Sequence, residues 1–168
     1  MGSLQEDESY MRMALEQAQM ASALGEVPVG AVIVCHGKVL GSAFNCVEMR
    51  KNAEAHAEMM VLERAAVALG DWRLNDCTLY VTKEPCAMCA GAAVNARLGR
   101  LVYGVPDAHC GGCGGGLDIT GFPQMLHRVP VTGHVLEEEC RQLLQLFFRS
   151  RRLERDADMG CARAGKGS

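Results

Sequence analysis

Residues 78–96 read TLYVTKEPCAMCAGAAVNA, and this stretch contains a strand, the start of a helix and two candidate metal ligands. Thr78 to Thr82 is a short apolar run of the kind that forms a buried strand. Pro85 suits the first turn of a helix, where its missing N–H costs nothing. The segment therefore predicts a strand that leads into a helix, with Cys86 and Cys89 on one face of the first turn.

A second stretch, His56-Ala57-Glu58, begins a run rich in Ala, Glu, Met and Leu that ends at Gly70. This composition predicts a helix over residues 56–69. Residues two apart point about 200° from each other on a regular helix, so His56 and Glu58 can share a site only where the helix begins. We therefore expect two helix N-termini to face one metal ion.

His56, Cys86 and Cys89 are candidate ligands for one zinc ion per chain. A structural zinc site is normally closed by four protein ligands, whereas a catalytic site leaves one position open for water or substrate. The positive end of a helix dipole favours the thiolate form that zinc binds. Two thiolates and a neutral imidazole balance the charge of Zn²⁺, which can lower the pKa of a water molecule towards about 7.

The order H-x-E followed by P-C-x-x-C is the signature of zinc-dependent nucleobase deaminases. Either motif alone is usually accidental, but the two together, with Pro85 in place, indicate a catalytic zinc site. Glu58 would accept a proton from water, deliver it to a ring nitrogen and later protonate the departing amine. General acid–base catalysis of this kind contributes roughly 10² to 10⁴-fold to a rate.

The remaining pattern alternates helices and strands, which predicts a three-layer α/β/α sandwich. The further elements that we expect are a helix from about Glu8 to Leu24, a hairpin of Val29–Cys35 and Val39–Phe44 around His36-Gly37-Lys38, a strand at Leu101–Gly104 and a helix from Leu136 to about Asp156. The chain has 168 residues, enough for one domain. We expect a single domain over residues 1–156 and a flexible tail over residues 157–168.

The composition is 49% hydrophobic and 22% charged, which is close to that of ordinary globular proteins. No run approaches the roughly 18 apolar residues of a membrane span, so a cytoplasmic protein without membrane attachment is expected. In such a protein the nine cysteines should be free thiols.

The formal net charge of −3 does not by itself indicate a nucleic-acid-binding protein. RNA binding would need a local patch of cations, for which Arg149, Arg151, Arg152 and Arg155 are candidates. The alternative is that these arginines form a solvated basic face on a terminal helix.

From about residue 10 to 155 the chain resembles the tRNA adenosine deaminases of the cytidine-deaminase-like superfamily, most closely the bacterial tRNA-specific type. Besides the zinc motifs, the resemblance rests on Glu26 to Val32, Asn45, Thr78 to Thr82, Cys89 to Ala92, Asp107-Ala108 and Phe147 to Arg152. It implies a mixed central sheet, a homodimer and hydrolysis of the wobble adenosine in a tRNA anticodon loop to inosine. Such enzymes act on unstacked bases.

The resemblance also assigns three substrate-binding residues. Asn45 matches an asparagine expected to hydrogen-bond the flipped base, although an asparagine also commonly ends a strand. Asp107 matches an aspartate near the RNA backbone, and Phe148 matches the terminal helix that closes the pocket. Aromatic residues and arginines at helical spacing are, however, also ordinary parts of a core and a surface.

The sequence departs from the family pattern at His109, where a lysine is common, and at Cys110-Gly111-Gly112-Cys113. Loss of a permanent cation should weaken a phosphate contact, because histidine is mostly neutral at pH 7. Cys110 or Cys113 could close the zinc site or form a second one, but spare thiols in a glycine-rich loop explain both residues.

Two other functions fit the zinc motifs. The chain could deaminate free guanine or cytosine, since the motifs indicate the reaction and not the substrate. It could also be a non-catalytic zinc subunit of a deaminase complex, although such a subunit would be expected to lack Glu58.

Overall fold

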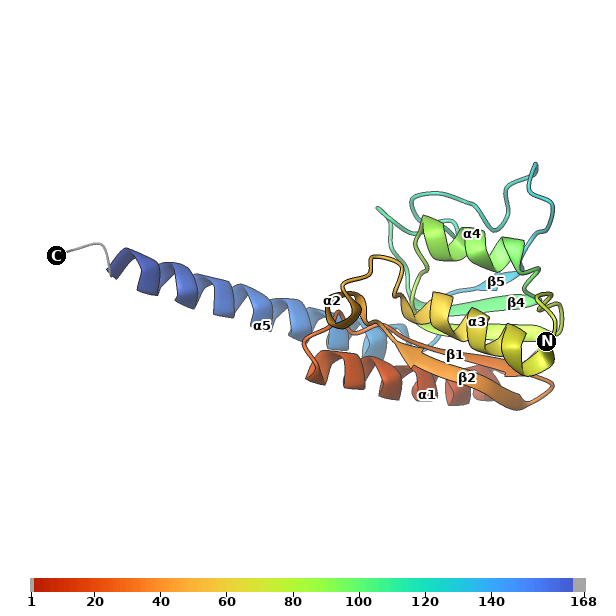
Figure 1. The fold of residues 1–168 in the computed structure, drawn as a ribbon, viewed down its shortest axis with the longest axis horizontal. Coiled ribbons are helices and arrows are strands. Elements are labelled where there is room, and N and C mark those ends of the chain that lie inside the picture. The colour runs from red at the N-terminus through yellow and green to blue at the C-terminus, as the bar shows by residue number, and fades with distance from the viewer. Residues whose placement is uncertain (1, 165–168) are drawn as a thin grey trace.

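The centre of the computed structural model, which describes residues 2–164, is a five-stranded sheet (Figure 1). Its strands are β1 (Gly30–Cys35), β2 (Lys38–Phe44), β3 (Cys77–Lys83), β4 (Arg100–Val105) and β5 (Val131–Thr132). They lie in the order β2-β1-β3-β4-β5. β1 is antiparallel to both of its neighbours, whereas β3, β4 and β5 are parallel, so the sheet is mixed as expected.

Helices cover both faces of this sheet (Figure 1). α1 (Leu4–Ala23) and α5 (Glu137–Ala164) lie on one face, and α3 (Ala57–Leu69) and α4 (Ala87–Asn95) lie on the other. The short helix α2 (Val47–Arg50) follows β2. The predicted three-layer α/β/α sandwich is therefore confirmed.

The alternation of side chains along each strand divides the core between the two faces. In β3, Leu79 and Val81 belong to the hydrophobic cluster beneath α3 and α4, whereas Tyr80 belongs to the cluster beneath α1 and α5. Because both faces are covered, β1 and most of β3 are buried along their length and read as continuous apolar runs.

A buried polar contact fixes the start of α1 against the sheet. Both carboxylate oxygens of Asp7 accept hydrogen bonds of 2.7 Å from the guanidinium of Arg100, and the Tyr80 hydroxyl donates to Asp7 Oδ1 at 3.0 Å. Asp7 is only 3% exposed, so the charge pair compensates for its burial.

The hairpin turn lies where it is expected, with His36 and Gly37 at φ of 48° and 76°. Two consecutive positive φ values are typical of the tight turns that join antiparallel strands. The prediction omitted α2 and β5, which are four and two residues long. α5 continues to Ala164 instead of ending near Asp156, and residues 165–168 of the expected flexible tail lie outside the described residues.

Two further expectations concern the described residues alone. None of their helices combines the length and apolar character that a membrane span requires. Cysteines 35, 46, 77, 86, 89, 110, 113 and 140 are all free thiols, as predicted.

Candidate active site

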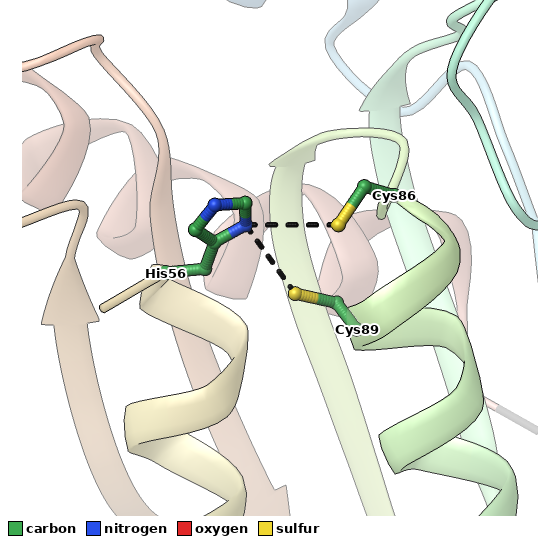
Figure 2. A group of neighbouring side chains, drawn as sticks. All are labelled: His56, Cys86 and Cys89. Carbon is green, nitrogen blue, oxygen red and sulfur yellow. Dashed lines mark hydrogen bonds between the residues drawn. The ribbon is translucent and has the colours of Figure 1, made fainter. Parts of the chain in front are cut away.

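Three side chains from two helices meet at one point, as Figure 2 shows. His56 Nδ1 lies 3.7 Å from the Sγ atom of Cys86 and 3.5 Å from that of Cys89. Within residues 2–164 these three residues form the one group of potential ligands whose atoms all lie within 4.8 Å of one another. The structure thus brings together all three predicted ligands.

The starts of α3 and α4 position these side chains. His56 is the N-cap residue of α3 and Cys86 is the N-cap residue of α4, and neither side chain caps its own helix. α3 therefore begins one residue and α4 two residues later than predicted, because the ligand itself precedes the first helical residue. Cys89 lies in the first turn of α4, so the positive ends of both helix dipoles face the cluster.

The distances between these atoms fit a zinc ion. Zinc bonds of about 2.3 Å to sulfur and about 2.0 Å to nitrogen, at tetrahedral angles, separate the two ligand atoms by about 3.5 Å. The observed separations of 3.7 and 3.5 Å are close to this value. One imidazole and two sulfurs are also a donor set that zinc commonly takes.

Protonation of the three ligands is coupled. Hydrogen bonds from Cys89 and then from His56 lower the pKa of Cys86 to about 3. The hydrogen bond between His56 and Cys86 raises the pKa of His56. A separate hydrogen bond between Cys89 and Cys86, together with burial, raises the pKa of Cys89. Cys86 is thus the ligand thiol that loses its proton more readily, and binding of a dication by both sulfurs would require Cys89 to lose its proton as well.

Glu58 lies in the first turn of α3, beside this cluster. It is 3% exposed, and burial raises the pKa of its carboxyl group. Its Oε2 atom has no hydrogen-bond partner, and it is the one buried side-chain oxygen or nitrogen among the described residues with none. An unpartnered buried carboxylate oxygen is costly, so this atom is available to a ligand or water.

The cluster opens into a cavity of about 800 Å³. This volume is within the roughly 300–1,000 Å³ that small-molecule sites occupy. The cavity is lined by Leu24, Gly25, Glu26, Val27, Val29, Asn45, Val47, Glu48, His56, Glu58, Lys83, Glu84, Cys86, Phe147, Phe148 and Arg151. It contains the expected acid–base residue, two of the three expected ligands and two of the three expected substrate-binding residues.

Asn45 and Phe148 lie on the cavity wall. Asn45 follows β2 and is 8% exposed, and its side-chain amide makes no hydrogen bond within residues 2–164. Phe148 is 44% exposed on α5 and packs edge-to-face against Phe147, with 5.4 Å between ring centroids. The amide can therefore hydrogen-bond a ligand, and the exposed ring can stack on one.

Asp107 does not line the cavity itself. Its carboxylate accepts hydrogen bonds from the backbone N–H groups of His109 and Cys110, both at 3.0 Å, and pairs with the Lys83 ammonium at the cavity wall. These contacts lower the pKa of Asp107 to about 2. The hydrogen bond from the Cys110 N–H has the largest effect, and the one from Lys83 has the next largest. Asp107 is therefore charged at neutral pH.

Two buried glutamates shape the cavity. The sequence predicted no role for either, although Glu26 belongs to the segments on which the family resemblance rests. Glu84 accepts hydrogen bonds from the N–H groups of Asp107, Cys113 and Gly115 at 2.8, 3.0 and 2.9 Å. Glu26 accepts from the N–H groups that begin α2, at 3.1 and 2.6 Å. The position of Glu84 directly before Pro85 of the zinc motif could have indicated a role at the site. Its hydrogen-bond partners, however, lie more than 20 residues away in the sequence.

α5 contributes Phe147, Phe148 and Arg151 to the cavity wall. Arg151 Nη2 donates to the Gly25 carbonyl oxygen at 2.6 Å, and its guanidinium carbon lies 5.3 Å from the centroid of the Phe147 ring. Of the four predicted basic residues, Arg151 thus holds α5 against the segment after α1. Arg149, Arg152 and Arg155 are exposed, and a shallow surface depression includes Arg152 and Arg155 beside Phe148.

The second pair of cysteines lies apart from the ligand cluster. Cys110 is exposed, whereas Cys113 is half-buried and its pKa is raised to about 12, mainly by burial. Neither joins the group of potential metal ligands. His109, the other departure from the family pattern, is exposed on the same loop.

Known proteins resemble the chain along most of its length. A sequence model of the MafB19-like deaminase family matches residues 5–152. A tRNA-specific adenosine deaminase of Bacillus subtilis is 45% identical over 153 residues, which cover 90% of this chain and 94% of that protein.

Solved structures of deaminases also resemble the chain. A structure from studies of A-to-I editing by tRNA deaminases at the wobble position of transfer RNA is 38% identical, with a TM-score of 0.78. The match covers 81% of this chain and 99% of that chain. A guanine deaminase of Bacillus subtilis is 30% identical with a TM-score of 0.58, over 73% of this chain and 82% of that one.

Proposed function

Because the chain belongs to the tRNA-specific adenosine deaminases of the cytidine-deaminase-like superfamily, we propose that it hydrolyses the wobble adenosine of a tRNA anticodon to inosine and ammonia. The observation that carries this proposal is a His-Cys-Cys cluster that shares a cavity with a buried, unpartnered carboxylate. An open metal position and a nearby proton carrier are what hydrolytic deamination of a base requires.

His56, Cys86 and Cys89 hold one zinc ion per chain in this proposal. When bound, zinc supplies the Lewis acidity that makes water nucleophilic near neutral pH. The ligand separations and the lowered pKa of Cys86 support this assignment. Cys110 and Cys113 have no ligand role.

Glu58 carries the protons of the reaction. Its carboxylate accepts a proton from the attacking water and donates it to a ring nitrogen of adenine. It then accepts the proton of the hydroxyl group that has bonded to the ring carbon and delivers it to the amine, which leaves as ammonia. Burial favours this role because it raises the pKa of the Glu58 carboxyl group. The proton affinity of the carboxylate is then closer to that of the water and the ring nitrogen with which it exchanges protons.

Asn45 and Phe148 hold the flipped adenosine in the cavity. The free amide of Asn45 hydrogen-bonds the base, and Phe148 contacts it from α5. Asp107, which pairs with Lys83 of the cavity wall, lies near the RNA backbone. The exposed arginines of α5 extend this surface towards the phosphates of the anticodon stem.

We further propose a homodimer in the cytoplasm, the compartment in which tRNA takes part in translation. The dimer is supported by the family resemblance. Its measurement is the mass in solution, which should be near twice the chain mass of 18.1 kDa. A single species at the chain mass would contradict the dimer and leave the reaction untouched.

Deamination of free guanine is the second candidate, because a guanine deaminase is 30% identical to the chain. The higher identity and coverage of the tRNA-specific relatives favour RNA. A non-catalytic subunit is disfavoured, since Glu58 is present and faces the ligand cluster.

The deciding experiment incubates zinc-loaded protein with an anticodon stem-loop that carries adenosine at the wobble position. Sequencing should find inosine at that nucleotide and at no other adenosine of the loop. A stem-loop with the adenosine moved by one position is the matched control. Absence of inosine, with ammonia released from free guanine instead, would reject the tRNA substrate and retain the zinc chemistry.

A further inference from the structure

Lys83 is the last residue of β3, and its side chain lies on the wall of the active-site cavity. The side chain is 31% exposed, and its ammonium pairs with Asp107, which is 17% exposed. Lys83 is three residues before Cys86, so the same strand-to-helix connection positions the cation and the ligand cluster. Neither the ligand cluster nor the proposed proton transfers use Lys83.

Asp107 holds the ammonium in a defined place. Its Oδ1 atom accepts the N–H groups of His109 and Cys110, which leaves Oδ2 for Lys83. The backbone N–H of Asp107 is itself bound by the buried carboxylate of Glu84. A flexible lysine is thereby fixed by a carboxylate that cannot easily move.

Lys83 is one of two cations in a cavity wall that is rich in acidic residues. Four glutamates line the cavity, together with the cations Lys83 and Arg151. Arg151 already contacts a carbonyl oxygen of the chain, the Glu154 carboxylate and an aromatic ring. Lys83 makes its one side-chain hydrogen bond within residues 2–164 to Asp107. An ammonium has three N–H donors, so donors remain for a ligand.

A polynucleotide substrate brings negative charge to this cavity. The Asp107 carboxylate beside Lys83 would repel a phosphate, and Lys83 offsets that charge while offering N–H groups to the phosphate. A free base or a nucleoside has no phosphate for Lys83 to contact.

We propose that Lys83 is a substrate-binding residue that donates hydrogen bonds to a backbone phosphate of the RNA beside the nucleotide in the cavity. This inference rests on the proposed tRNA substrate. Lys83 would then contribute to the preference for RNA over free bases. It would do so by strengthening substrate binding and not by accelerating the chemical step.

The test compares Lys83→Gln with the wild type and with Lys38→Gln, which removes the same charge from the exposed first residue of β2. Zinc-loaded proteins act on the wobble-adenosine stem-loop at several salt concentrations. Lys83→Gln should raise KM about tenfold with kcat within about twofold. It should also reduce the slope of log(kcat/KM) against log[salt] by about 0.7. Lys38→Gln should match the wild type, and Lys83→Arg should recover part of the loss.

A second series identifies the phosphate. Each linkage next to the wobble adenosine is replaced in turn by a neutral methylphosphonate. At the contacted linkage, the methylphosphonate should raise the KM of the wild type by the same factor as Lys83→Gln raises it on the unmodified stem-loop. The same methylphosphonate should raise the KM of Lys83→Gln little further. If Lys83→Gln does not fold or bind zinc, the series with the wild-type protein still tests the proposal. A wild-type KM that no methylphosphonate changes, at any of the linkages, would overturn it.

Other outcomes separate the two proposals. An unchanged KM and salt slope in Lys83→Gln, or a fall in kcat alone, overturns the phosphate contact and leaves tRNA deamination standing. If the wild type binds the stem-loop but forms no inosine, the proposed function fails and the affinity measured for each variant still tests Lys83. If the wild type neither binds nor deaminates the RNA, both proposals are overturned.

Discussion

At the scale of single residues, Glu58 combines almost complete burial with an oxygen that has no partner. Folding alone would not favour this arrangement, because a buried polar atom without a hydrogen bond destabilises the folded state. A catalytic group must keep a lone pair free for the proton that it transfers. The proposed proton transfer accounts for this unfavourable position, whereas packing does not.

Replacement of this carboxylate tests its role. Glu58→Gln should lower kcat by roughly 10² to 10⁴-fold, because the amide cannot accept and return a proton. Zinc content and the thermal midpoint should not fall, since the amide has the same shape. Glu63→Gln, at an exposed position of α3, is the matched control. Turnover at the wild-type rate in Glu58→Gln would contradict the assignment.

Glu84 is a different kind of buried carboxylate, because three backbone N–H groups satisfy it. Glu84→Gln replaces one acceptor oxygen with an N–H₂ donor that faces these N–H groups. We expect the free energy of unfolding, measured in urea, to fall by about 2–4 kcal/mol. The exposed Glu139→Gln should change it by less than about 0.5 kcal/mol. An equal effect of both changes would show that the loop does not depend on Glu84.

At the scale of elements, the close approach of α1 to β1 depends on Gly30. A Cβ atom at Gly30 would lie 2.0 Å from the Ala14 carbonyl oxygen and 2.5 Å from the Ala18 nitrogen. Both are backbone atoms of α1, so the helix would have to move away from the sheet. No rotation of a side chain can relieve such a contact.

Two glycine substitutions should therefore have opposite effects. Gly30→Ala should destabilise the protein by about 3 kcal/mol in urea unfolding, because overpacking forces the backbone to shift. Gly91→Ala should stabilise it by roughly 0.5–1 kcal/mol, since a Cβ at this position of α4 meets no atom within 4 Å and alanine favours a helix. A loss of stability in both variants would contradict this account of Gly30.

The elements differ in how far the sequence could predict them. Helices and strands longer than five residues were predicted with ends within about four residues, apart from α5, because their apolar spacing is local. α2 and β5 were missed, since each depends on partners that are distant in sequence. The N–H groups that begin α2 bind Glu26, and β5 exists through its pairing with β4.

The same distinction applies to the site. The ligand cluster and Glu58 were predicted because the spacing of each motif lies within one helical turn. The contacts of Lys83 and Glu84 were not predicted, because the loop that follows β4 takes its shape from hydrogen bonds to residues more than 20 positions away. Sequence spacing carries no information on such contacts.

At the scale of the whole molecule, α5 extends well beyond the sheet (Figure 1). Its 28 residues correspond to about 42 Å of helix. Phe147, Phe148 and Arg151 contact the cavity, and the following turns carry exposed arginines away from it. The helix therefore offers cations at a distance from the reacting base.

Removal of these cations should weaken RNA binding without slowing the reaction. Arg152→Gln with Arg155→Gln should reduce the salt dependence of stem-loop affinity, by about 0.7 in log–log slope for each lost phosphate contact. The rate at saturating RNA should stay unchanged. Arg12→Gln with Arg73→Gln, two exposed arginines on other elements, is the control with the same change in charge. Equal losses of affinity in both double variants would show that binding is not localised on α5.

The closure of the cavity by α5 has a consequence for synthesis on the ribosome. The last of the three potential ligands is residue 89 and β4 ends at residue 105, whereas Phe147 to Arg151 leave the exit tunnel more than 40 residues after β4. The proposed zinc ion could thus bind to a nascent chain before α5 covers the pocket. Docking of α5 afterwards would enclose a centre that already holds the ion, so delivery of the ion would need no later opening of the folded protein.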